Sequence, residues 1–199
     1  MKTLGRQREF NEAELNGLAA DQEEIRSRAF YDCTFTKCSF REAKFAYCKF
    51  NDCTFVDCDL SLAAFVDTSF RDTRFERSLL VGVNWTLADW PDFTREAQVG
   101  FLKCTLDYAT FIGLKLHKLQ LVECSVKDVD FSDADLTEAD FGRAVLAKSQ
   151  FRNTNLTKAN FEGAAEYQIN PTQNNITKAR FAMPEAMSLL YGLDIVLVD

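Results

Sequence analysis

The sequence predicts a solenoid of short repeats, because a large apolar residue returns at every fifth position over most of the 199 residues. Fifteen of the eighteen phenylalanines lie at these positions. A period of five fits neither the 3.6-residue period of an α-helix nor the two-residue period of a strand. A fixed repeat of this kind indicates stacked units that bury one continuous core. The large positions are Phe30, Phe35, Phe40, Phe45, Phe50, Phe55, Leu60, Phe65, Phe70, Phe75, Leu80, Trp85 and Trp90, then Phe101, Leu106, Phe111, Leu116, Leu121, Val126, Phe131, Leu136, Phe141, Leu146, Phe151, Leu156 and Phe161.

The position two residues before each large one is small in most repeats. Two inward residues in five require the chain to turn a corner every five residues, with the small residue letting successive walls approach. Leu114 and Leu119 are too large for this position, so the coil that contains them is expected to be distorted. Cysteines here are expected to be reduced, buried and hydrophobic in role, and neither a disulfide nor a metal site is predicted. All seven cysteines occupy the small position: Cys33, Cys38, Cys48, Cys53, Cys58, Cys104 and Cys124.

The repeat follows a motif of a small residue, Asp or Asn, Leu or Phe, and two polar residues, as in Ala134-Asp135-Leu136 and Ala159-Asn160-Phe161. With this motif over residues 28 to 181, the chain resembles the pentapeptide-repeat family. The resemblance implies an all-β fold, a right-handed quadrilateral β-helix in which four pentapeptides form one square coil of 20 residues. Coils then stack as parallel strands about 4.8 Å apart. Two aromatic columns follow, one of Phe30, Phe50, Phe70 and Trp90 and one of Phe35, Phe55 and Phe75.

Interruptions of the repeat divide the chain into five segments. Residues 1–24 carry a weak repeat and many charges, and they are expected to form an irregular cap or first coil. Repeat coils are expected over 25–90 and 101–181. Residues 91–100 cannot keep the five-residue spacing and are expected to form a loop that leaves the rod. Residues 182–199 drop the repeat and are expected to form a C-terminal helix and strand.

The C-terminal segment has the features of a capping helix followed by a strand. Pro184 suits the first turn and Gly192 the position after the end. An apolar face of Met183, Met187, Leu190 and Tyr191 is expected to cover the open coil. Residues 195–198 then present an unpaired apolar edge, for which a two-fold copy of the chain is the simplest partner. We therefore predict a homodimer formed through Met187, Leu190, Tyr191, Ile195 and Leu197.

The formal net charge of −7 argues against direct nucleic-acid binding and is compatible with a basic partner or with simple solubility. Asp32, Asp52, Asp72 and Asp92 recur at 20 residues, and therefore on one wall of successive coils. Stacked carboxylates repel one another unless a partner or counterions relieve them. This column of aspartates is the candidate partner-binding surface.

Two other regions are candidates for contact with a partner. Phe93, Arg95 and Glu96 of the loop form a possible second contact. Acidic residues also concentrate between Glu123 and Asp140, where Asp130, Asp135 and Asp140 are expected to serve corner turns instead.

Several classes of function are not supported by the residues. No run of about 18 apolar residues could span a membrane, and the N-terminus lacks the apolar region of a secretory signal, so a cytoplasmic protein is expected. The single histidine, His117, has no nucleophile beside it in any recognisable pattern, and no phosphate-binding loop occurs. We therefore expect no enzyme activity, no cofactor and no metal.

The terminal Pro184-Glu185-Ala186-Met187-Ser188-Leu189-Leu190 and the mid-chain Gly82-Val83-Asn84-Trp85-Thr86 with Trp90-Pro91 resemble one branch of the family. This branch contains the quinolone-resistance (Qnr), mycobacterial fluoroquinolone-resistance and albicidin-resistance proteins, and the similarity to the albicidin-resistance members is greatest. The resemblance implies a dimeric DNA mimic that binds DNA gyrase, in some members also topoisomerase IV, and protects it from inhibitors. The alternative is a structural or scaffold module with no topoisomerase role.

Overall fold

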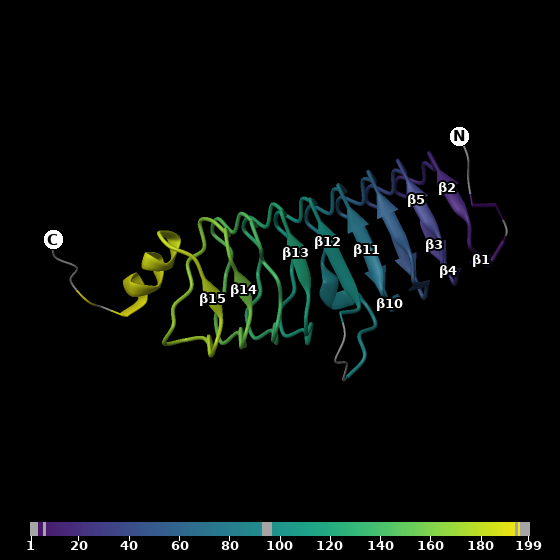
Figure 1. Cartoon of the computed structure of the whole chain (residues 1–199). Helices are drawn as coiled ribbons and strands as arrows, with labels where there is room; N and C mark the ends of the chain where they lie inside the picture. The colour runs from purple at the N-terminus through teal and green to yellow at the C-terminus, as the bar shows by residue number, and fades with distance from the viewer. Residues whose placement is uncertain (1–3, 6, 93–96, 194, 196–199) are drawn as a thin grey trace.

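The chain forms a rod of about eight stacked square coils, with a short helix at its C-terminal end (Figure 1). The computed structural model describes residues 4, 5, 7–92, 97–193 and 195. Every strand pairs in parallel with the strand of the next coil, as the quadrilateral β-helix requires. Within the described part of the chain, no helix is long and apolar enough to cross a membrane.

The four walls of the rod are numbered here in the order in which the chain meets them. Face 1 consists of β1 (Glu9–Asn11), β4 (Ala29–Tyr31), β7 (Lys49–Asn51) and β10 (Ser69–Arg71). Face 2 consists of β2 (Glu14–Asn16), β5 (Thr34–Thr36), β8 (Thr54–Val56), β11 (Thr73–Glu76), β12 (Val99–Leu102) and β13 (Gln120–Val122), and further along of β14 (Asn160–Phe161) and β15 (Arg180–Phe181). Face 3 is held by single bridges such as Ser39 to Asp59. Face 4 consists of β3 (Glu24–Arg26), β6 (Lys44–Ala46), β9 (Ala64–Val66) and the 3-10 turn η1 (Trp85–Leu87).

The large residues fill the centre of the rod in columns of stacked rings. Phe30 stacks on Phe10 and Phe50 with centroid distances of 4.9 and 5.0 Å, and Phe70 stacks on Trp90 at 5.9 Å. The column through Phe35, Phe55 and Phe75 has spacings of 4.4 and 4.8 Å. Both predicted columns are therefore confirmed. Parallel-stacked aromatic pairs add stability beyond the apolar area that they bury.

The small positions satisfy the backbone at the corners in two ways. The N–H of Cys38 donates to Sγ of Cys58 at 3.3 Å, and the N–H of Cys58 donates to Oγ of Ser78 at 3.0 Å. Where the small residue is Ala63, its N–H instead donates to the carbonyl of Leu60, three residues earlier, at 3.0 Å. Thiols and hydroxyls thus supply acceptors that an alanine cannot. All seven cysteines are buried in these positions, as expected.

The residue two after each large one turns the corner with a left-handed backbone. Twenty-six described non-glycine residues have positive φ, from +45° at Asp72 to +64° at Tyr108. This conformation is costly for residues other than glycine, asparagine and aspartate. The coil offsets the cost through inter-coil hydrogen bonds, such as that from the N–H of Asp32 to the carbonyl of Asn51 at 3.0 Å. The side chains at these corners point outward, so they decide what the rod presents to a partner.

The rod begins earlier than the sequence predicted. Phe10, Leu15 and Ile25 pair in register with Phe30, Phe35 and Phe45, so residues 9–26 form a regular coil and not an irregular cap. The first coil expected within residues 1–24 is therefore present, but it is regular and its last strand extends to Arg26.

The insertion after Trp90 is shorter than predicted, and the coil that follows it is regular. Strand β12 already starts at Val99, so the insertion ends at residue 98 and not at residue 100. The expected distortion at Leu114 is absent, since the N–H of Leu116 donates to the carbonyl of Asp135 at 2.8 Å in the ordinary ladder. Leu114 is accommodated because it stays partly exposed at the edge of the core.

The C-terminal helix η2 (Glu185–Leu193) starts where predicted but has 3-10 geometry. Three residues per turn align positions 186, 189 and 192, and Leu189 therefore packs on the core. The predicted covering face was wrong, because Met183, Met187 and Tyr191 are exposed. Gly192 lies inside the helix and not after it. A Cβ at Gly192 would lie 3.0 Å from side-chain atoms of Asn170 and Pro171, so glycine allows the close packing here.

Candidate protein-binding surface

Asp32, Asp52 and Asp72 occupy the same corner of three successive coils, where the chain passes from face 1 to face 2. Their φ values are +51°, +54° and +45°, and the N–H of Asp52 donates to the carbonyl of Arg71 at 2.8 Å. Aspartate is one of the few residues that tolerate this backbone. The predicted column therefore exists, and it has a conformational basis that the spacing alone did not reveal. Three outward carboxylates lie about 4.8 Å apart along the rod.

Two arginines partly neutralise this column. The Arg71 guanidinium lies 3.0 Å from the Asp52 carboxylate, and that of Arg74 lies 3.3 Å from Asp72. Among the residues that the structure describes, Asp32 forms no ion pair. Both arginines lie on strands next to the corner, and neither was among the residues predicted for this surface. The available signal was spacing, because Arg71 follows Asp52 by 19 residues, which is almost one coil.

Asp92 does not continue the column. Trp90 still packs under Phe70, and Asp89 still bridges to Ser69. Asp92 is exposed but lacks the left-handed backbone of the other three, because the chain departs from the rod here. The prediction of Asp92 as a fourth stacked carboxylate was wrong.

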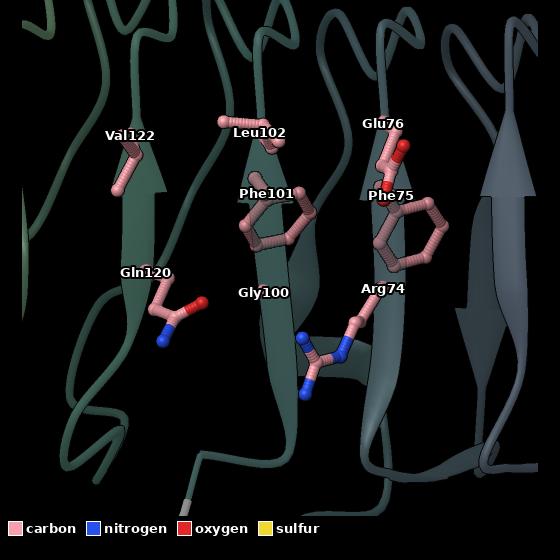
Figure 2. A pocket seen from close by; sticks show the side chains of 8 residues that line it. All are labelled: Arg74, Phe75, Glu76, Gly100, Phe101, Leu102, Gln120 and Val122. Carbon is pink, nitrogen blue, oxygen red and sulfur yellow. The ribbon is translucent and has the colours of Figure 1, made fainter.

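The insertion leaves the rod beside face 2 (Figure 1). Phe93, Arg95 and Glu96, the predicted loop contacts, lie outside the described residues. On the neighbouring wall Gly100 has no side chain, and a shallow hollow opens there. Figure 2 shows the side chains of Arg74 and Gln120 pointing toward this gap from the strands on either side, with Leu102 and Val122 above it.

The second acidic concentration is mainly structural. Oδ1 of Asp130 accepts the N–H of Ser132 at 2.8 Å, and Asp135 and Asp140 make the same turn, which confirms the expected corner role. Glu123 lies 2.6 Å from the Arg143 guanidinium, and this hydrogen bond lowers the pKa of Glu123.

The C-terminal residues predicted for dimerisation lie at the free end of the rod. Tyr191 is 78% exposed, and Met187 and Ile195 are also exposed. Leu190 is half-buried. Leu197 lies outside the described residues. The 3-10 helix therefore turns Met187 and Tyr191 away from the coil that they were expected to cover.

Comparison with known proteins gives a family and structural relatives for this chain. A family model described as a pentapeptide repeat region matches residues 28–111 and 97–161. A trypsin-treated form of QnrB1, a plasmid-mediated fluoroquinolone resistance protein, has a similar structure with a TM-score of 0.65 and 18% identity over 93% of this chain and 100% of that one. Full-length QnrB1 gives a TM-score of 0.60 and 18% identity over 94% and 100% of the two chains. No curated protein matches the sequence. Because the family model covers more than half of the residues, the chain belongs to the pentapeptide-repeat family.

Proposed function

We propose that this protein is a DNA mimic that binds DNA gyrase and protects it from a topoisomerase inhibitor such as albicidin or a quinolone. The observation that carries the proposal is the column of Asp32, Asp52 and Asp72 on a rigid rod. Along one DNA strand the phosphates recur at about 3.4 Å of axial rise, and the column repeats at about 4.8 Å. A basic surface built to hold DNA would therefore meet a regular row of negative charges, spaced more widely than the phosphates of one DNA strand. QnrB1, whose fold the chain shares, is a fluoroquinolone resistance protein, and this is in line with the proposed protection from a quinolone.

The proposed mechanism is binding without catalysis. The column docks on the basic surface where gyrase holds DNA, and the insertion supplies a second contact. No cofactor takes part, and the protein works in the cytoplasm together with gyrase, and with topoisomerase IV if that enzyme presents the same surface. Docking of this electrostatic kind weakens steeply as salt is added.

We propose further that two copies join through their C-terminal ends. Met187, Tyr191 and Ile195 are exposed apolar residues near the C-terminal end of the rod, and exposed apolar surface is typical of an interface. Deletion of the residues after Gly192 is expected to give monomers in analytical ultracentrifugation. A dimer that survives this deletion would exclude the tail as the interface.

A supercoiling assay tests the function directly. Purified gyrase acts on relaxed plasmid with a fluoroquinolone or with albicidin, and the protein is titrated into each reaction. We expect supercoiling to recover with at least one inhibitor. If the protein changes neither the uninhibited nor the inhibited reactions, the scaffold alternative replaces this proposal.

A further inference from the structure

The corner between faces 3 and 4 carries apolar residues where the rest of the rod has polar ones. Of the 26 described non-glycine residues with a left-handed backbone, all but three are charged or polar. The exceptions are Tyr47, Leu62 and Tyr108, which are 51%, 57% and 65% exposed. Tyr47 has a local explanation, because the Arg26 guanidinium lies 4.7 Å from the centre of its ring. In the described part of the chain Tyr108 forms no such cation–π contact, and the Leu62 side chain covers Gly82 of the next coil without being buried.

Leu62, Gly82 and Tyr108 hold this corner in three successive coils. The N–H of Leu62 donates to the carbonyl of Val81 at 2.8 Å, and that of Gly82 donates to the carbonyl of Asp107 at 2.9 Å. A Cβ at Gly82 would lie 2.6 Å from Cδ2 of Leu62, so the leucine side chain lies across the glycine. Leu79, which is also exposed, lies on face 3, where it bridges to Asp59 and Thr105. We name this surface the apolar strip, and it consists of Leu62, Leu79, Val81, Gly82 and Tyr108.

The apolar strip differs from the other corners in the apolar character of its exposed side chains. A leucine or tyrosine with positive φ is strained, and its exposure leaves apolar surface in water. Neither residue contributes to the buried core. Departures of this kind from local preference occur where a protein binds something.

Acidic residues close the apolar strip at both ends. Glu42 precedes Leu62 by one coil, and Asp128 follows Tyr108 by one coil, in the same corner position. Within the part of the chain that the structure describes, neither carboxylate forms an ion pair. At about 4.8 Å per coil, the two carboxylates stand roughly 19 Å apart. This charge pattern disfavours a second copy of the chain, which would bring acidic residues together.

We propose that the apolar strip is a docking surface for an extended protein segment with apolar side chains in its middle and basic residues at both ends. An extended chain covers roughly 19 Å in about six residues. The surface lies diagonally opposite the aspartate column, so the proposal does not depend on gyrase binding. Both surfaces can be occupied at once.

A labelled peptide tests this directly by fluorescence anisotropy. The probe is Gly-Arg-Arg-Ser-Leu-Ser-Leu-Trp-Ser-Arg-Arg-Gly, and two control peptides replace its Leu and Trp by Ser or its Arg by Glu. We expect the probe to bind the full chain at least about tenfold more tightly than either control peptide. Leu62→Asn combined with Tyr108→Asn should weaken binding by a similar factor. Asparagine suits the left-handed backbone, so this variant should fold at least as stably as the parent.

A matched control variant and a charge variant separate the two recognition elements. Tyr47→Asn removes an equally exposed aromatic ring at another corner and should leave binding unchanged. Glu42→Lys with Asp128→Lys should weaken binding and reverse its salt dependence, because the arginines of the probe then meet like charges. The proposal is overturned if the probe binds no better than the serine control peptide. It is equally overturned if the folded Leu62→Asn/Tyr108→Asn variant binds as the parent does.

Discussion

The corner between faces 1 and 2 carries only acidic residues before the insertion and residues of both charges after it. Before it the corner residues are acidic in four successive coils: Glu12, Asp32, Asp52 and Asp72. After it they are mixed: Lys118, Glu138, Lys158 and Lys178. In the second half Nζ of Lys158 lies 2.8 Å from the Glu138 carboxylate, so neighbouring corners neutralise each other. Because the same backbone accepts either pattern, the like charges of the first half are not a requirement of the fold.

This difference makes the second half an internal control for the first. The Glu138–Lys158 ion pair neutralises two of the four charges of the second column, which carries both signs. In the first column Arg71 and Arg74 reduce the repulsion without removing it, since both carboxylates remain accessible. Exposed ion pairs contribute little to stability, so the charge left over on the first column is available to a partner.

The largest expected effect is the loss of gyrase binding when the first column is reversed. Asp32→Lys, Asp52→Lys and Asp72→Lys together should weaken binding by at least about a thousandfold, because three attractions become repulsions. Surface plasmon resonance with immobilised gyrase measures this. The control is Glu138→Lys with Lys158→Glu, which exchanges charges at the same corner and keeps the net charge. A folded triple variant that binds like the parent would rule out the column as the recognition surface.

The next largest effect is the loss of stability when a core residue on face 1 is truncated, beneath the acidic or the mixed corner. Phe50 lies under the acidic half between Phe30 and Phe70, whereas Leu136 occupies the same wall in the second half. Phe50→Ala should lower the free energy of unfolding by about 3–5 kcal/mol, and Leu136→Ala by about 2–5 kcal/mol. Urea denaturation followed by circular dichroism measures both. A loss below about 1 kcal/mol for Phe50→Ala would show that the ring column is not a main source of stability.

The repeat made most of the rod predictable, because a strict period of five assigns every residue to a wall, a corner or the core. Phe30 and Phe50 could be paired from the sequence alone, and the structure places them in register. The first coil is more regular than expected, because Ala20 and Ile25 at its large positions are smaller than most phenylalanines of the later coils and make its repeat look weak in the sequence. Their role follows from contact with the next coil, which a local pattern cannot show.

The surface was less predictable than the core. Arg71 and Arg74 reach Asp52 and Asp72 through long flexible side chains, so their pairing depends on rotamers and not on the period. The helical pattern after Pro184 fits an α-helix and a 3-10 helix equally well, although the two bury different residues. The sequence also does not reveal that Leu62 occupies a strained corner, because its φ of +59° is a property of the coil.

A smaller effect is expected when the arginines of the first column are removed. Arg71→Gln with Arg74→Gln should tighten gyrase binding several-fold, since the column keeps its carboxylates and loses the two cations that partly neutralise it. The salt dependence of the affinity should become steeper. Lys158→Gln in the second half serves as the control and should change neither quantity. An unchanged or weaker affinity in the double variant would instead assign the arginines a direct contact with gyrase.

The smallest effect is the pH dependence contributed by the Glu138–Lys158 pair in the second half. The hydrogen bond from Lys158 lowers the pKa of Glu138 below its usual value. A carboxyl whose pKa is lower in the folded state stabilises the protein above its unfolded pKa, and this contribution is lost as the pH falls through the folded value. Between pH 5 and pH 3 the Tm of the parent should therefore fall slightly more than that of Glu138→Gln, by about 1 °C for one exposed pair. Differential scanning calorimetry over this range measures the two slopes. Parallel slopes would show that the Glu138–Lys158 pair contributes nothing to folding, and the charge alternation after the insertion would then need another explanation.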